Sequence, residues 1–359
     1  MNDKAMAVKG QTDLTTLANL GRIANEVAAQ NLFADYRSRK AERTVKRQDA
    51  DLALFAAYLS GIVERARATG TTPELESAPA GHDLAHDAKA WQPITWGLVT
   101  GFRQWQLQRG YAVGSVNVRL STVRTYAKLA LKAGVLDADE YTRIRAVEGY
   151  DGTEAKRIDA ARKQAEIDTR KGAKKAEPTP LTKEQADQLK VQPDTPQGRR
   201  DALLMHLLLD LGLRVNEVVL LRVSAVDLVD EVITFYRPKV DKWQTHRLAD
   251  GLLRAIRAWI ERDALAVGPL LRTSRKGGKL TDRGMSERAV FKRVAYLGDR
   301  VGVEGLSPHD LRHYWATRAA RNGTPAERLK DAGGWTSIVT ADRYVQAAAI
   351  ANEGVVIDG

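Results

Sequence analysis

Apolar residues recur with helical spacing through the first half of the chain. From Arg43 to Ala66 they fall near one face of a helix, at Val45, Leu52, Phe55, Leu59 and Ile62. A loop rich in Thr, Pro, Gly and Ala follows over residues 67–86. Helical patterns then cover residues 95–110, 115–135 and 137–147, with Ser115 expected as an N-cap. Residues 31–150 are therefore predicted to form a compact all-helical domain, after a polar lead-in (1–30) with one weak helix.

The second half of the chain has a more mixed pattern. Residues 198–228 indicate two helices broken at Gly212. Residues 231–250 place β-branched and aromatic residues on both sides of a turn containing Pro238, which predicts a β-hairpin. Helices are expected from there onward, one of them over residues 282–302. The predicted fold class is mainly α with a small antiparallel β-sheet in the second domain.

This pattern divides the chain into segments. The second domain is expected over residues 181–350, followed by a C-terminal tail (351–359). Residues 151–180 are charged, poor in large apolar residues and closed by two prolines, so they are expected to be a basic linker, partly helical.

Composition narrows the function classes. The chain of 359 residues has a formal net charge of +11 and no cysteine, which excludes disulfides, thiol nucleophiles and Cys-based zinc sites. It has no stretch of about 18 apolar residues and no apolar leader, so we expect no membrane span and a cytoplasmic protein. The positive net charge favours a polyanionic binding partner, and a basic surface without such a partner is the alternative.

The stretch "LSPHDLRHYWATRAARNG", Leu306 to Gly323, carries the first candidate chemistry. Ser307 as N-cap, with Asp310 three residues later, predicts a helix start. His309 and Arg312 then lie on one side of a helix end that favours anions, which indicates a phosphate pocket. His309 and His313 have zinc-helix spacing, but Arg312 would place a permanent cation beside the metal. A purely structural helix cap remains an alternative.

Three other residues stand out by their order along the chain. Arg214 in "GLRVNE" follows the break at Gly212, and Glu217 three residues later can hold its guanidinium; alone, this is an ordinary ion pair. "GGWTSIVTADRYV" carries Trp335 and, nine residues later, Tyr344. Considered alone, each of these aromatic residues would be interpreted as a half-buried residue of a helix.

Taken together, the ordered series resembles the tyrosine recombinase (phage integrase) family. The family pattern is Arg, Lys, His-x-x-Arg, His or Trp, and Tyr, and this chain can fill every position. The resemblance covers residues 181–350 and extends to the first domain, because the family carries an N-terminal helical core-binding domain. It implies that Arg214 and Arg312 bracket a phosphate, that Glu217 supports Arg214, and that Tyr344 is the nucleophile. His309 would assist proton transfer or hydrogen-bond the phosphate.

The remaining family positions are filled less directly. In the hairpin turn, alignment of "PK" favours Lys239 over Lys242 as the catalytic lysine. Trp335 takes the place that most members give to His, and it can offer an indole N–H or packing but no proton exchange. His313 takes the place of a frequent supporting residue.

The resemblance also implies a reaction and partners. Tyr344 would attack a scissile phosphate to give a 3′-phosphotyrosyl DNA, with Lys239 protonating the leaving 5′ oxygen and with neither metal nor cofactor. Two rounds of exchange would pass through a Holliday junction. The partners would be double-stranded DNA with specific recombination sites, a homotetramer on DNA (monomer or weak dimer when free) and accessory DNA-bending proteins. The expected DNA contacts are Lys46, Arg47, Arg119, Arg124, Arg283, Arg288 and Lys292.

Three alternative functions remain. A type IB topoisomerase shares the tyrosine chemistry but relaxes supercoils. A degenerate recombinase would bind DNA without cutting it, although every catalytic position here holds an acceptable residue. A zinc hydrolase would bind metal at His309 and His313.

Overall fold

The computed structural model describes residues 3–70, 77–171, 175, 177–275 and 277–348, with side chains from residue 16 onward. The chain divides into two compact units, Met1–Lys174 and Lys175–Gly359, each with its own core. The predicted fold class, mainly α with small antiparallel sheets, is confirmed. Among the described residues, no helix is long and apolar enough to cross a bilayer. The expected tail, 351–359, lies outside the described residues.

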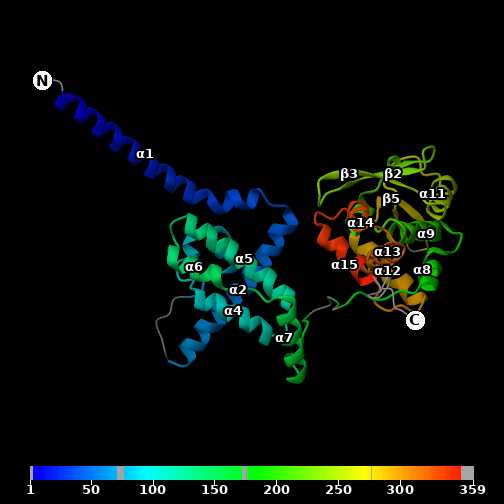
Figure 1. Ribbon diagram of the computed structural model, residues 1–359, viewed down its shortest axis with the longest axis horizontal. Coiled ribbons are helices and arrows are strands. Elements are labelled where there is room, and N and C mark those ends of the chain that lie inside the picture. The colour runs from blue at the N-terminus through cyan, green and yellow to red at the C-terminus, as the bar shows by residue number, and fades with distance from the viewer. Residues whose placement is uncertain (1–2, 71–76, 172–174, 176, 276, 349–359) are drawn as a thin grey trace, which may run out of the picture. The chain divides into compact units, whose positions relative to one another are not determined.

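The described part of the first unit is helical (Figure 1). Helix α5 contacts α1, α2, α4 and α6, so it forms the centre of the unit. The predicted apolar stripes are buried here, as Leu52 and Phe55 on α2 and Val116 and Leu120 on α5 show. The helices are α1 (Asp3–Ser38), α2 (Glu42–Ala68), α3 (Gly81–His86), η1 (Ala88–Trp91), α4 (Trp96–Gln108), α5 (Val113–Lys132), α6 (Ala138–Ala146) and α7 (Gly152–Gln164).

Two local expectations for this unit were wrong. Ser115 is not an N-cap, because α5 already begins at Val113, which is buried, and Ala112 takes the cap position. The predicted loop over 67–86 also contains α3, whose carbonyl at Leu84 accepts a hydrogen bond of 2.9 Å from Nε1 of Trp91. Burial of that tryptophan folds the segment onto the core, an effect of tertiary packing.

The charged segment 151–180, expected to be a partly helical linker, begins with helix α7. Asp151 caps α7, and Arg162 on that helix is buried. Its guanidinium donates to the carbonyl oxygens of Tyr111 at 2.8 Å and Thr169 at 3.0 Å. The start of the expected linker is thus attached to the first unit.

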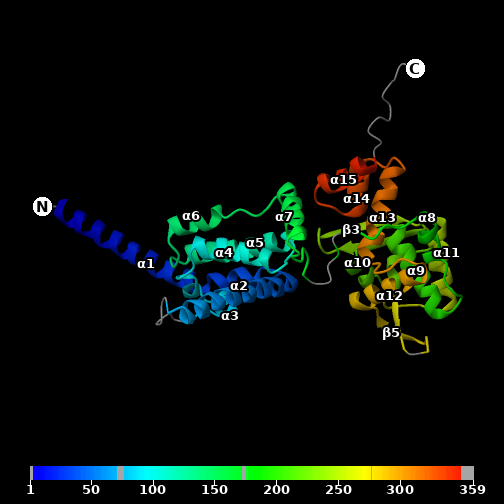
Figure 2. The ribbon, with the colours of Figure 1, turned by 90° about the horizontal axis from the view of Figure 1, so that it is seen from below.

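The second unit surrounds α9, whose leucines form the middle of its core. Strands β1, β2 and β3 make an antiparallel sheet in that order, and β4 and β5 make a separate hairpin. Helices α13, α14 and α15 pack together at one end (Figure 2). The elements are α8 (Lys183–Lys190), α9 (Pro196–Leu209), α10 (Val215–Leu220), η2 (Val223–Ala225), β1 (Val226–Asp227), β2 (Val232–Arg237), β3 (Lys242–Arg247), α11 (Asp250–Arg262), β4 (Arg272–Ser274), β5 (Leu280–Gly284), α12 (Glu287–Arg300), α13 (Pro308–Arg321), α14 (Ala326–Gly333) and α15 (Ile338–Ala348).

The predicted break at Gly212 and the predicted hairpin are confirmed, as β2 and β3 flank a turn over residues 238–241. The expected helix over 282–302 starts later than predicted. Strand β5 pairs with β4, and α12 begins only after Ser286, whose Oγ accepts a hydrogen bond from the Ala289 N–H at 3.2 Å. Arg283, an expected DNA contact within that predicted helix, therefore lies on strand β5.

Candidate active site

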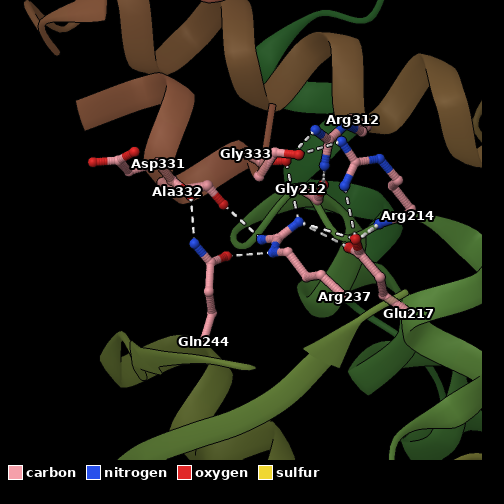
Figure 3. Close-up of polar contacts among 10 residues, drawn as sticks. Gly212, Arg214, Glu217, Arg237, Gln244, Arg312, Asp331, Ala332 and Gly333 are labelled. Atoms are coloured by element: carbon pink, nitrogen blue, oxygen red, sulfur yellow. Dashed lines mark hydrogen bonds and ion pairs between the residues drawn. The ribbon is translucent and has the colours of Figure 1, made fainter. Parts of the chain in front are cut away.

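Three guanidinium groups converge on the C-terminal end of α14 (Figure 3). They come from the N-cap of α10, from the end of β2 and from the first turns of α13. The hydrogen bonds run from Arg214 to the Gly334 carbonyl at 2.8 Å, from Arg312 to the Gly333 carbonyl at 2.5 Å, and from Arg237 to the carbonyls of Ala332 at 2.7 Å and Gly333 at 3.1 Å. The last carbonyls of a helix lack partners within it and carry partial negative charge, so this helix end attracts cations.

One buried carboxylate holds two of these arginines. Glu217 is 1% exposed, and its Oε1 accepts from Nη1 of Arg214 at 2.8 Å and from Nη1 of Arg237 at 3.1 Å. Its Oε2 accepts from the Arg214 backbone N–H at 2.9 Å, which caps α10. Within this cluster three guanidinium groups face one carboxylate, so a net positive charge remains that an anion can neutralise.

Arg312 is held by backbone carbonyls on both sides. It is 4% exposed and also donates from Nη1 to the Gly212 carbonyl at 2.5 Å. Burial, and next the charge of Arg214, lower the pKa of Arg312 to about 9, so the group is still charged at neutral pH. Gly212 has φ of 57°, and a Cβ there would lie 2.2 Å from the Trp315 ring. A glycine is therefore required at this break.

Trp335 connects the arginine cluster to Tyr344. The Arg312 guanidinium carbon lies 4.7 Å from the centre of the Trp335 ring, and that ring stacks on Tyr344 with centroids 5.6 Å apart. The ring of His313 lies 5.2 Å from that of Tyr344. Burial raises the pKa of Tyr344, against the opposing effect of Arg312, so the phenol is protonated at neutral pH. Burial, and next His309, lower the pKa of His313.

The start of α13 has the predicted cap. Ser307 is the N-cap, and its N–H and Oγ both donate to Oδ2 of Asp310 at 2.8 Å. Asp310 also accepts from Lys175 Nζ at 2.7 Å and from the Thr179 N–H at 3.1 Å. Burial opposes the charge, but these hydrogen bonds lower the pKa of Asp310 overall. Asp310 is thus a helix-capping carboxylate, and His309 beside it is exposed on the first turn.

The two candidate lysines lie on the β2–β3 hairpin. Lys239 is exposed in the turn, and Lys242 is the first residue of β3, paired in register with Arg237. Asp241 closes the turn with φ of 48°, and its Oδ1 accepts from the Tyr236 hydroxyl at 2.5 Å. Arg237 places this hairpin beside the arginine cluster.

The expected DNA contacts fall into two groups. In the first unit, two of these arginines form ion pairs with Asp51: Nη1 of Arg47 lies 2.6 Å from its Oδ2, and Nε of Arg119 lies 3.8 Å from its Oδ1. Exposed Lys46 forms an ion pair with Glu42. Asp51 and its Thr122 partner hold those two arginines partly within the unit. Arg124 is half-buried. In the second unit the side chains are all exposed: Arg283, Arg288 and Lys292.

Sequence reasoning missed Arg237 and Gln244. Arg237 is fully buried, and its Nε donates to Oε1 of Gln244. A signal was present, because Ile233, Phe235 and Arg237 alternate along β2 and all three are buried. An arginine in phase with two core residues of a strand indicates a buried cation that needs an acidic partner.

No group of three or more metal-ligating side chains occurs within the part of the chain that the structure describes. His309 and His313 differ in setting, since the first is exposed and the second lies against Tyr344. The geometry favours an anion site built from guanidinium groups over a metal centre.

Known proteins with related sequences are tyrosine recombinases. Tyrosine recombinase XerD of Neisseria meningitidis serogroup B is 31% identical over 185 residues, which cover 50% of this chain and 62% of that relative. Tyrosine recombinase XerC of Vibrio vulnificus is 27% identical over 270 residues, covering 74% of this chain and 76% of XerC. The XerD match thus spans less than two thirds of that protein.

Two solved structures share the fold. A lambda integrase dimer bound to a COC′ core site has a TM-score of 0.57 at 13% identity, covering 92% of this chain and 97% of that one. The Tn1549 transposon integrase in complex with transposon right end DNA has a TM-score of 0.56 at 15% identity, covering 91% and 96%. Residues 179–350, which contain the whole arginine cluster and Tyr344, match the sequence model of the phage integrase family. Residues 179–350 therefore form a phage integrase family domain, and the chain is similar to the tyrosine recombinases XerD and XerC.

Proposed function

We propose that the protein is a site-specific DNA recombinase that cuts and rejoins strands through a 3′-phosphotyrosyl intermediate. The observation that carries this proposal is the contact series from Arg312 through Trp335 to Tyr344, at 4.7 Å and 5.6 Å. It places a phenol beside a buried excess of positive charge. Cleavage of a phosphodiester requires a nucleophile close to groups that stabilise the negative charge on the non-bridging oxygens of the phosphate.

In the cleavage step, Arg214 and Arg312 bind the non-bridging oxygens of the scissile phosphate. The Tyr344 oxygen attacks phosphorus and forms a P–O bond, while the bond from phosphorus to the 5′ oxygen breaks. Because burial raises the pKa of Tyr344, its proton has to leave as the bond forms. His309 on the first turn of α13 assists this transfer or hydrogen-bonds the phosphate. Lys239 donates a proton to the leaving 5′ oxygen.

Rejoining is the same step in reverse. The 5′ hydroxyl of a partner strand attacks the phosphotyrosine, and Tyr344 leaves as a phenol. The phosphoester bond is conserved throughout, so no nucleotide is consumed. Two such exchanges, passing through a Holliday junction, need four protomers on two DNA sites. We infer a tetramer on DNA from this requirement, and the net charge of +11 supports a DNA partner.

The test is covalent capture. Wild-type protein is incubated with a pool of nicked duplexes that carry a randomised segment, the mixture is denatured, and the DNA that stays attached is sequenced. We expect one preferred sequence attached through its 3′ phosphate, and no adduct with Tyr344→Phe, which should still bind DNA. Adducts that persist with Tyr344→Phe would refute the assignment. Adducts without sequence preference, together with relaxation of any supercoiled plasmid, would indicate a topoisomerase instead.

A further inference from the structure

The arginine that the family pattern does not include makes the most connections in the site. Arg237 ends β2, and its side chain is fully buried. It donates to Glu217 at 3.0 Å and 3.1 Å, to the carbonyls of Gly333 and Ala332, and to Gln244. All three of its guanidinium nitrogens already donate to protein groups, so we place Arg237 behind the phosphate-binding arginines rather than in contact with DNA. Any role in the reaction must act through its neighbours.

These neighbours belong to different parts of the site. Glu217 holds Arg214, and the Gly333 carbonyl is shared with Arg312. Gly334, next in the chain, packs on the Arg237 side chain and leads into Trp335. One guanidinium thus joins the hairpin to both phosphate-binding arginines (Figure 3).

Gln244, on the other strand of the hairpin, provides a second hydrogen-bonded attachment to α14. Its Nε2 donates to the Asp331 carbonyl at 2.8 Å, while its Oε1 accepts from Arg237. Both β2 and β3 are therefore attached to the end of α14. The two attachments lie on either side of the turn over residues 238–241, which carries Lys239.

An exposed turn lysine needs such an attachment to act as a general acid. A lysine side chain has several rotatable bonds, and a proton donor must come within about 3 Å of its acceptor in the transition state. The distance from Lys239 to a phosphate held by Arg214 and Arg312 depends on where the hairpin lies relative to α14. Arg237 and Gln244 are the side chains that set this relation.

We propose that Arg237, together with Gln244, is a positioning residue that fixes the hairpin turn of Lys239 against the arginine cluster, and so governs protonation of the leaving 5′ oxygen. This inference rests on the proposed function. It differs from a general structural role because it concerns one proton transfer.

The experiment compares two leaving groups on the DNA sequence recovered by covalent capture. In one nicked duplex the scissile 5′ oxygen is retained, and in the other it is replaced by sulfur. Attack by Tyr344 on the second breaks a P–S bond, and the thiolate leaves without a proton because thiols are far more acidic than alcohols. A defect in proton donation should therefore appear with oxygen and largely disappear with sulfur.

Adduct formation is measured for Arg237→Lys, Gln244→Leu and, as the reference for a missing acid, Lys239→Ala. We expect Arg237→Lys to slow cleavage of the oxygen substrate by about 10²-fold, within the range for general acid catalysis, and to approach wild type on sulfur. Gln244→Leu should show a smaller defect of the same kind. Arg247→Lys, the same change on exposed β3 surface, is the matched control and should cleave both substrates normally.

Equal losses on oxygen and sulfur for Arg237→Lys and Gln244→Leu would overturn the proposal. If circular dichroism shows that Arg237→Lys does not fold, Gln244→Leu decides alone. Failure of wild-type protein to form an adduct on either DNA would refute the proposed function itself, and this inference with it. Cleavage by wild type without sulfur rescue of the variants would refute the positioning role alone.

Discussion

The Arg312 guanidinium carbon lies 4.7 Å from the centre of the Trp335 ring, and the ring planes of Trp335 and Tyr344 are only 25° apart. The indole therefore contacts both the charge of Arg312, proposed to bind phosphate, and the proposed nucleophile. An indole cannot exchange a proton near neutral pH, so its contribution is to hold these two groups at a set separation.

Trp335 should be replaceable by another flat ring but not by a small side chain. We expect Trp335→Phe to retain most covalent adduct formation. Trp335→Ala should lower its rate by about 10²-fold, because a displacement of about 1 Å in a reacting group can cost that much. The measurement is adduct formation over time on the captured DNA. Equal rates for the two variants would contradict a spacing role.

Glu217→Gln should destabilise the second unit strongly. The change leaves Arg237 and Arg214 without their shared carboxylate, and breaking a buried ion pair on one side costs about 3 kcal/mol or more. Urea unfolding measures the loss. Glu304→Gln, at an exposed position, should leave the unfolding midpoint unchanged. A midpoint for Glu217→Gln equal to that of the control would show that the cluster does not need the charge.

Gly334→Ala should lower the thermal unfolding midpoint more than Gly323→Ala does. Both glycines have positive φ, 58° and 81°, so both changes incur the left-handed backbone cost of about 1 kcal/mol. At Gly334 the new Cβ would also lie 2.6 Å from Cδ of Arg237, whereas Gly323 has open space around it. Equal shifts in the two variants would mean that Arg237 can move aside.

His246 should make stability fall as the pH falls below neutrality. Burial, and next the charge of Arg237, lower the pKa of His246 from 6.5 to about 4. Between these values the unfolded chain binds a proton that the folded chain does not, so acidification favours unfolding, by about 2 kcal/mol at most for a partly exposed ring. His246→Gln should flatten the change in urea midpoint between about pH 7 and about pH 5. An unchanged slope in this variant would assign the effect to other groups.

Exposed Arg288 and Lys292, four residues apart on α12, should contribute to DNA affinity through phosphate contacts. Each lost contact lowers the slope of log affinity against log salt by about 0.9, so Arg288→Ala with Lys292→Ala should lower it by about 2. The measurement is DNA binding across a salt series. A slope equal to that of wild type would show that this helix face does not contact DNA.

Much of the fold could be predicted from the spacing of apolar residues, glycines and prolines along short segments. The buried stripe of α2, the break at Gly212 and the hairpin around Pro238 follow from periodicity and from glycine and proline placement, which act over a few residues. The β4–β5 hairpin and the attachment of Arg162 were not predictable in this way. Short strands pair with partners that sequence periodicity does not reveal. Arg162 could not be distinguished by sequence from the exposed charges of the linker, because its carbonyl acceptors on Tyr111 and Thr169 are brought to it only by folding.

By itself, the sequence determined which candidate site residues the chain has and in what order: Arg214, the His309–Arg312 pair, Trp335 and Tyr344. It also placed His309 and Arg312 at a capped helix start, because capping depends on residues within one turn. The tertiary structure alone decided that the end of α14 gathers Arg214 and Arg312, and that Arg237 joins them to the hairpin. Arg214 and Gly334 are 120 positions apart, and only packing of the whole unit brings a guanidinium to that carbonyl.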